Sequence, residues 1–264
     1  MFFTLNSWEL ALIIFAVVGG VAALGALAGR LIREHSEASH EPLGVIQAAL
    51  LGVVGRVLAF GLSLAVGRYQ DRRADVVDEA NAIGTAYLRA QTIAEPQRTQ
   101  TIVLMRRYID LAIAVSHERP GGAALAATTA QEGSAQRALW RLAGQSLNAA
   151  PGASAPRLYV DSLNAMFDAQ SERLAGLNNR VPNAVLWLEL LGAAFAVGMI
   201  ALYLAVLGKG LAPVVAAGVL VSVVVLVSFD LDRPTRGWIH VPATPLLAER
   251  ASMQLPPAAP APHR

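Results

Sequence analysis

The stretch RYQDRRADVVDEANAIGTAYLRA, residues 68–90, follows directly on an apolar run of membrane-spanning length and contains nothing that breaks a helix. Its apolar residues Val76, Ala80, Ile83 and Tyr87 recur every three to four positions, which is the spacing of the buried stripe of an amphipathic helix. We therefore predict that a transmembrane helix continues out of the membrane without a break and becomes the first helix of a soluble domain.

The composition of the chain is that of a membrane protein. Of its 264 residues, 55% are hydrophobic and 15% are charged, and the mean hydropathy is positive, unlike that of an average soluble domain. The apolar residues form four blocks, each of about the 20 residues that a helix needs to cross a bilayer. The first block lacks the basic start of a signal peptide, so we expect it to remain as a transmembrane helix. The blocks are residues 8–29, 43–67, 184–208 and 211–229.

The region between the second and third blocks is predicted to be a helical bundle. Apolar stripes with helical spacing alternate with breaks at Pro96, Pro120 and Pro151. They predict soluble helices at residues 68–94, 97–118, 131–148 and 156–180. The fold class is therefore all-α, an integral membrane protein with four transmembrane helices and a cytoplasmic helical-bundle domain. The expected domains are residues 1–67 with transmembrane helices one and two, 68–183, 184–229 with helices three and four, and a partly disordered tail at 230–264.

The basic residues near the membrane predict the orientation. Four spans place the N-terminus, the helical domain and the tail on one side, where most of the arginines beside the membrane are found. Only Arg30, Arg33 and Lys209 lie on the other side. By the positive-inside rule, the N-terminus, the helical domain and the C-terminus are expected to be cytoplasmic, in a bacterial inner membrane.

Three segments beside the membrane blocks resemble the hallmark segments of the bestrophin-like domain family, a widespread and largely uncharacterised family of membrane proteins. They are residues 68–90, NRVPNAVLWLELL at 179–191 and DLDRPTRGWIHV at 230–241. They occur in the order of the family and extend from the second membrane block to the start of the tail. The chain is therefore identified as a member of this family.

The resemblance implies kinship with bestrophins, which are pentameric, anion-conducting channels with four membrane helices and mostly helical cytosolic domains. It implies that this chain forms a homo-oligomer in the lipid bilayer and interacts with an anion. Directly after the fourth block the acidic residues are Asp230 and Asp232 alone, so the acidic calcium-binding cluster of bestrophins has no clear counterpart. The function that the resemblance implies is an oligomeric anion-conducting channel. The alternative function is a non-conducting membrane scaffold or signal-coupling protein.

Charged residues are expected to gather at one face of the membrane, where the second and fourth blocks end and the third begins. Such a ring could bind an anion or a lipid headgroup, because arginines offer forked donors that match phosphate and carboxylate groups. It could instead be a belt of salt bridges that fixes the orientation of the helices. The residues of this charged ring are Arg68, Asp71, Arg72, Arg73, Arg180, Asp230, Asp232, Arg233 and Arg236.

Two charged residues, Arg56 and Glu189, stand well inside the predicted spans. Arg56 lies midway along the second block, where an unpaired charge is costly, and Glu189 lies near the start of the third. Their depths in the membrane differ by about 9 Å, which two long side chains could nearly span. We expect either a buried ion pair between the second and third transmembrane helices or an anion-attracting residue in a pore. In the first block, Gly25 and Gly29 form a GxxxG pattern that predicts close helix packing.

The sequence gives no sign of an enzyme. It has no cysteine, no nucleotide-binding or catalytic motif and no supported triad, so we predict no enzymatic activity and no cofactor. The loop at residues 30–42 has two histidines and three glutamates, but their spacing matches no strong zinc pattern, so no metal site is predicted. A net charge of +2 without basic runs argues against a nucleic-acid partner.

Overall fold

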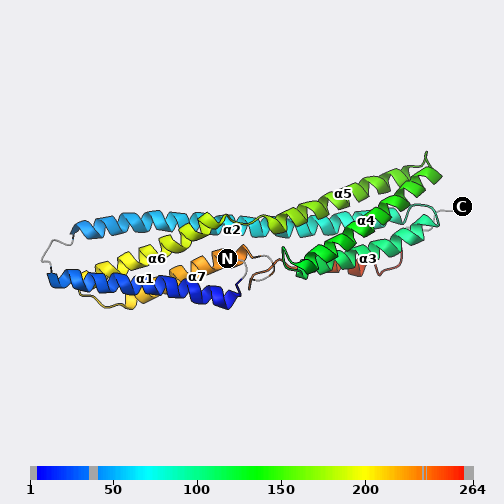
Figure 1. The fold of residues 1–264 in the computed structure, drawn as a ribbon. Coiled ribbons are helices and arrows are strands. Elements are labelled where there is room, and N and C mark those ends of the chain that lie inside the picture. Colours follow the sequence, from blue (N-terminus) through cyan, green and yellow to red (C-terminus); the bar gives the residue numbers. More distant parts are fainter. Residues whose placement is uncertain (1–4, 36–40, 234, 236, 259–264) are drawn as a thin grey trace. The chain divides into compact units, whose positions relative to one another are not determined.

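The computed structural model describes residues 5–35, 41–233, 235 and 237–258. The described chain contains helices and no strand, which confirms the all-α fold. The helices are α1 (Ser7–His35), α2 (Glu41–Ala90), α3 (Gln97–His117), α4 (Ala123–Ala149), α5 (Ser154–Asn178), α6 (Asn183–Val206), α7 (Ala212–Leu231) and α8 (Thr244–Ser252) (Figure 1).

The helices are divided between two compact units. The membrane unit comprises Met1–Tyr69 and Arg180–His240, and the helical unit comprises Gln70–Asn179 and Val241–Arg264. The helix α2 belongs to both, with its apolar first part in the membrane unit and its amphipathic second part in the helical unit. Its 50 residues confirm that the apolar run and residues 68–90 form one helix.

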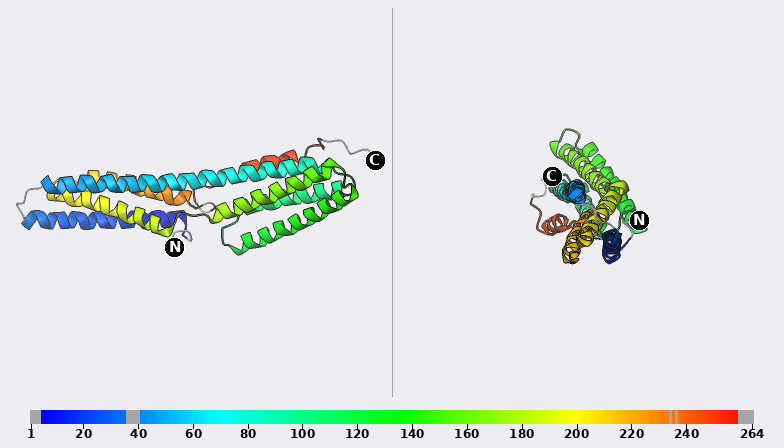
Figure 2. Two further views of the ribbon diagram at one scale, coloured as in Figure 1. Left: turned by 90° about the horizontal axis from the view of Figure 1, so that it is seen from above. Right: turned by 90° about the vertical axis from the view of Figure 1, so that its left-hand side faces the viewer.

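In the membrane unit, α1, α6, α7 and the first part of α2 lie side by side (Figure 2). Among the described residues, four helical stretches are long and apolar enough to cross a membrane, as expected. They lie within Ser7–Arg33, Gln47–Ala90, Ser154–Val206 and Ala212–Leu231. The GxxxG pattern of α1 lies against α6, since a Cβ built on Gly25 would meet the backbone of Gly198 and one on Gly29 the backbone of Leu202. Only glycine allows the two helices to approach this closely.

The helical unit packs the second part of α2 with α3, α4, α5 and α8 around one core. All four residues of the α2 stripe are buried, with Ile83 fully inaccessible to solvent. They contact Met105 and Tyr108 of α3 and Leu139 of α4 in one hydrophobic cluster. The stripes read from the sequence are therefore the surfaces that the helices bury, as the physics of amphipathic helices requires.

Two parts of the helical unit differ from the sequence prediction. The helix α4 begins at Ala123 rather than at 131, and its early residue Leu125 packs on Val115 and Leu177. The tail contains α8, for which no helix was expected. Leu246 of α8 and Met253 after it are buried in the core of this unit.

The position of α8 is fixed by polar contacts as well as by burial. The Tyr87 hydroxyl and Arg106 Nη2 both donate hydrogen bonds to the Met253 carbonyl, at 2.9 and 2.8 Å. Arg250 forms an ion pair with Asp110 at 2.7 Å. The Glu249 carboxylate lies against Gly84 of α2, where a Cβ would meet it at 2.8 Å. This part of the tail is therefore an integral element of the helical unit.

Candidate functional site

The membrane-spanning part of α2 presents one open face, which we call the α2 face. At 100° per residue, Val45, Gly52, Arg56 and Ser63 fall on one line along the helix, and all four are exposed. The residues on either side of this line are mostly small and are exposed as well. They are Ala48, Ala49, Val53, Gly55, Ala59 and Phe60.

Within the chain little covers the α2 face. Only 11% of the apolar segment of α2 is buried, compared with 44% for that of α7. A Cβ built on Gly52 or Gly55 would meet no atom within 4 Å. The face must therefore be in contact with lipid, water or another subunit, and its polar members make lipid an unfavourable neighbour.

Arg56 is exposed on this face and does not pair with Glu189. No ion pair or hydrogen bond of Arg56 is found in the described part of the chain, so the ion pair expected between the two residues is not formed. The reason is that Arg56 and Glu189 lie on different sides of α2. Glu189 faces α2 at Gly61, and Gly61 is about 140° around the helix from Arg56.

Glu189 instead joins three helices of the membrane unit behind the α2 face. It is 1% exposed, and its Oε2 accepts a hydrogen bond of 3.1 Å from the Ser228 hydroxyl of α7. Its carboxylate occupies the place that a Cβ on Gly61 of α2 would take. Its Oε1 has no hydrogen-bond partner among the described residues. The side chain therefore fixes α6 against both α2 and α7 at the rear of the exposed helix.

At the end of α7, three residues of the predicted charged ring form a buried cluster. Asp230, Asp232 and Arg233 are each at most 3% exposed. Asp230 accepts hydrogen bonds from the Ser7 hydroxyl at 3.3 Å and from the Ile239 amide at 2.8 Å.

The other two members of this cluster tie further segments to α7. Asp232 accepts a hydrogen bond from the Val181 amide at 2.9 Å, and Arg233 donates one to the Leu5 carbonyl. A Cβ on Gly237 would meet the Asp230 carboxylate at 2.8 Å, so the glycine permits the chain to fold back on α7. The cluster thus ties the starts of α1 and α6 and the segment after α7 together.

The remaining residues of the charged ring are divided between the units. Arg68 and Arg180 are half-buried in the membrane unit. In the helical unit, Asp71 and Arg73 are exposed and Arg72 is buried. Arg236 lies outside the described residues. The complete ring and its binding of an anion or a lipid headgroup therefore stay predictions.

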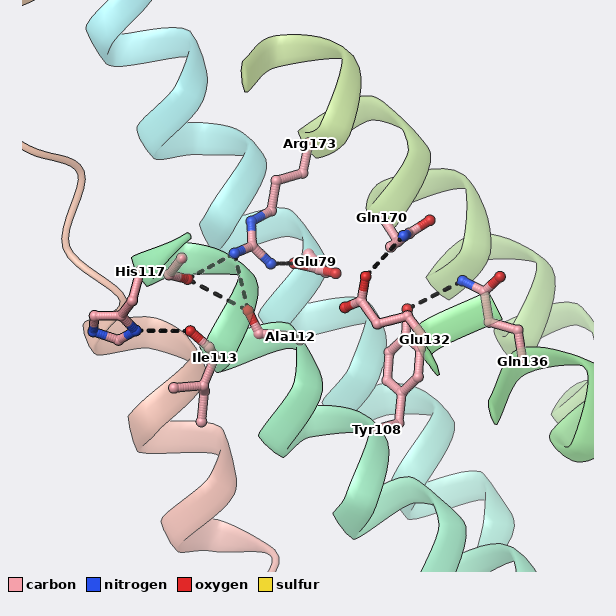
Figure 3. Close-up of polar contacts among 10 residues, drawn as sticks. Glu79, Tyr108, Ala112, Ile113, His117, Glu132, Gln136, Gln170 and Arg173 are labelled. Atoms are coloured by element: carbon pink, nitrogen blue, oxygen red, sulfur yellow. Dashed lines mark hydrogen bonds and ion pairs between the residues drawn. The ribbon is translucent and has the colours of Figure 1, made fainter. Parts of the chain in front are cut away.

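The helical unit contains a second polar cluster, which the sequence analysis did not predict (Figure 3). Glu79 of α2 forms an ion pair with Arg173 of α5, and the two residues are 0% and 3% exposed. Arg173 Nη2 also donates to the Ala112 carbonyl at 3.0 Å and to the Ser116 hydroxyl at 2.6 Å. The guanidinium thus joins α5 to α2 and α3.

Glu132 of α4 completes this buried cluster. It is 0% exposed, and its Oε2 accepts a hydrogen bond of 3.1 Å from Gln170 of α5. Next to it, Gln136 donates to the Tyr108 hydroxyl at 3.3 Å. A signal was present in the sequence, because Glu132 falls on the same helix face as the buried Ala135 and Leu139. A charged residue in an apolar stripe indicates a buried polar contact.

Neither cluster resembles a metal site. No group of three or more histidine, cysteine, aspartate or glutamate side chains converges within the described residues. Glu37 and His40, which belong to the loop considered for metal binding, lie outside that part of the chain. The geometry of the membrane unit instead combines an exposed arginine on a transmembrane helix with buried carboxylates that fix the helices around it.

Comparison with known protein families places the chain in one of them. The model of the bestrophin-like domain matches residues 14–246. The protein belongs to the bestrophin-like family. No curated protein matches the chain.

Solved structures with a similar fold include mutants of a bacterial bestrophin homologue from Klebsiella pneumoniae. One has 13% sequence identity and a TM-score of 0.64, and the match covers 91% of this chain and 96% of that one. A second has 12% identity and a TM-score of 0.65, with 92% and 93% covered. A mutant described as a membrane protein has 13% identity and a TM-score of 0.69, with 95% and 99% covered. At this identity the likeness establishes the fold.

Proposed function

We propose that this bestrophin-like protein is the subunit of a homo-oligomeric channel that conducts anions, and that the α2 face lines the conduction path. The observation that carries the proposal is Arg56, which is exposed halfway along a membrane-spanning helix and has no partner among the described residues. A guanidinium in hydrocarbon costs several kcal/mol, so such a residue faces water or another protein surface.

The composition of the α2 face suits a water-filled path. Gly52 and Ser63 lie on the line of Arg56, and small residues flank it, so several copies of the helix could surround a space without filling it. A ring of arginines attracts anions and repels cations. Phe60 is 63% exposed, one helical turn beyond Arg56, and its copies would form an apolar constriction beside the arginines at position 56.

The membership of the family supports the same function. The sequence resemblance connects the chain to bestrophins, which are oligomeric anion channels, and the fold is shared over nearly the full length of bacterial homologues. We further propose that the protein lies in a bacterial inner membrane with its N-terminus, helical unit and tail in the cytoplasm. That orientation follows from the arginines near the membrane.

The proposal predicts a specific effect of Arg56→Gln on ion flux. Purified protein in liposomes is expected to release trapped chloride, and the variant to release it about tenfold more slowly, the effect of roughly 1.4 kcal/mol on the barrier for the anion. Arg119→Gln is the matched control, because Arg119 is an exposed arginine of the helical unit.

Two results would contradict the proposal. If Arg56→Gln and Arg119→Gln release chloride at the rate of the original protein, Arg56 does not face the conduction path. If the original protein is monodisperse and folded but its liposomes are ion-tight under every gradient applied, the alternative of a scaffold or signal-coupling protein is supported instead.

A further inference from the structure

Two carboxyl groups and one guanidinium are buried together in the helical unit. Glu79 and Glu132 come from α2 and α4, and Arg173 from α5. The neutral side chains Tyr108 and Ser116 of α3, Gln136 of α4 and Gln170 of α5 also face this cluster. Asp75 of α2, which is only partly buried, interacts electrostatically with Arg173. With both acids ionised, the cluster would carry one negative charge in excess. A buried charge without a partner is unfavourable, so the excess negative charge must be neutralised.

The hydrogen bonds of the cluster show which carboxyl oxygens lack a donor. Among the described residues, Arg173 forms its ion pair with Glu79, and Gln170 donates to Glu132 Oε2. The Oε1 atoms of both glutamates are buried and lack a hydrogen-bond donor in the described structure. Figure 3 shows the two carboxyl groups directed toward one another between α2 and α4. Two buried carboxylates that interact electrostatically repel each other, and a proton on one of them removes this repulsion.

We propose that Glu79 and Glu132 form a proton-binding site in the core of the helical unit, at which Glu132 takes up one proton while Glu79 stays ionised beside Arg173. With this proton bound, the two carboxyl groups and the guanidinium carry no net charge. Loss of the proton leaves two carboxylates in the same core and weakens the packing of α4 on α3 and α5.

The environment of Glu132 places its titration in the physiological range. Burial raises the pKa of Glu132 from 4.5 to about 7. The hydrogen bond from Gln170 lowers this pKa, the charge of Glu79 raises it and the charge of Arg173 lowers it. Because the folded protein binds this proton more tightly than the unfolded chain does, its contribution to stability is complete below pH 4.5 and is lost as the pH rises through about 7.

The experiment compares the full chain in detergent with its Glu132→Gln variant by denaturant unfolding at a series of pH values. For the original protein, the folding equilibrium constant is expected to fall by about 150-fold between pH 4.5 and pH 8, as the pKa values of 4.5 and about 7 dictate. Glutamine imitates the protonated acid and cannot lose a proton, so the variant should lack this fall. Glu172→Gln removes an exposed glutamate of α5 and should behave like the original protein.

A second measurement follows the proton itself. Infrared difference spectra of the original protein between low and high pH should contain the carbonyl band of a buried carboxylic acid that disappears near pH 7. This band should be absent from Glu132→Gln, which keeps other buried carboxyl groups such as Glu189. The proposal is overturned if the original protein and Glu132→Gln show the same pH dependence. It is also overturned if stability at high pH is restored by Na⁺ and not by a bulky cation, because the site would then bind a metal ion. Neither measurement uses ion flux, so the result is independent of the proposed channel activity.

Discussion

Replacing Arg173 with methionine is expected to lower the free energy of unfolding by about 3–5 kcal/mol, because it removes one partner of a buried ion pair. Glu79, its partner, is fully buried. Methionine keeps most of the apolar length of the arginine side chain, so the loss reports the charge rather than a cavity. The Ala112 carbonyl and the Ser116 hydroxyl lose a donor at the same time. The measurement is denaturant unfolding of the detergent-solubilised chain, followed by circular dichroism.

Two further variants separate the charge from other effects. The double variant Arg173→Met with Glu79→Leu should recover most of the lost stability, because replacing both members of a buried pair with apolar residues is often neutral. Arg157→Met changes an exposed arginine of the same helix and should cost less than about 1 kcal/mol. If the double variant is no more stable than Arg173→Met alone, the ion pair is not the source of the loss.

The helices of this protein follow from local patterns in its sequence. An apolar stripe such as Val76, Ala80, Ile83 and Tyr87 depends only on the spacing of nearby residues, and it indicates both the helix and the face that is buried. The continuity of α2 could be predicted for the same reason, since nothing between the apolar run and the stripe breaks a helix. The apolar spacing of the tail residues after Pro242 is less regular. The helix α8 was not predicted because it is short and depends on burial of Leu246 by the rest of the unit.

The candidate site depends on rotations and distant pairings, which sequence spacing does not determine. Counting residues placed Arg56 and Glu189 at depths that two long side chains could nearly span, but α2 turns Gly61 toward Glu189 and Arg56 away from it. Glu79 and Arg173 are 94 positions apart, so their pairing follows only from the packing of α2, α3 and α5. The sequence could identify the charged residues of each helix, whereas the structure decides which of them share a buried space.

In the membrane unit, Gly25→Leu is expected to cause the largest loss of stability. A Cβ at position 25 would lie 2.9 Å from the carbonyl carbon of Gly198 and closer still to its oxygen. The obstacle is backbone, so no side chain can rotate out of the way, and α1 must separate from α6. We expect a loss of at least about 3 kcal/mol, toward the upper end of what overpacking costs. A lower thermal unfolding temperature of the purified protein, by roughly 6–12 °C or more, is the measurement.

Gly20→Leu is the matched control because it lies in the same helix and adds the same side chain. Gly20 is exposed, and a Cβ there would meet no atom within 4 Å. In a membrane-spanning helix an exposed leucine is favourable, so this variant should unfold within a few degrees of the original protein. Equal losses of stability from both variants would show that the contact with α6 is not the cause. Replacing either glycine would then be harmful for another reason, for example at a contact between subunits. A loss confined to Gly25→Leu would instead establish that the stability of the membrane unit depends on the close approach of α1 to α6.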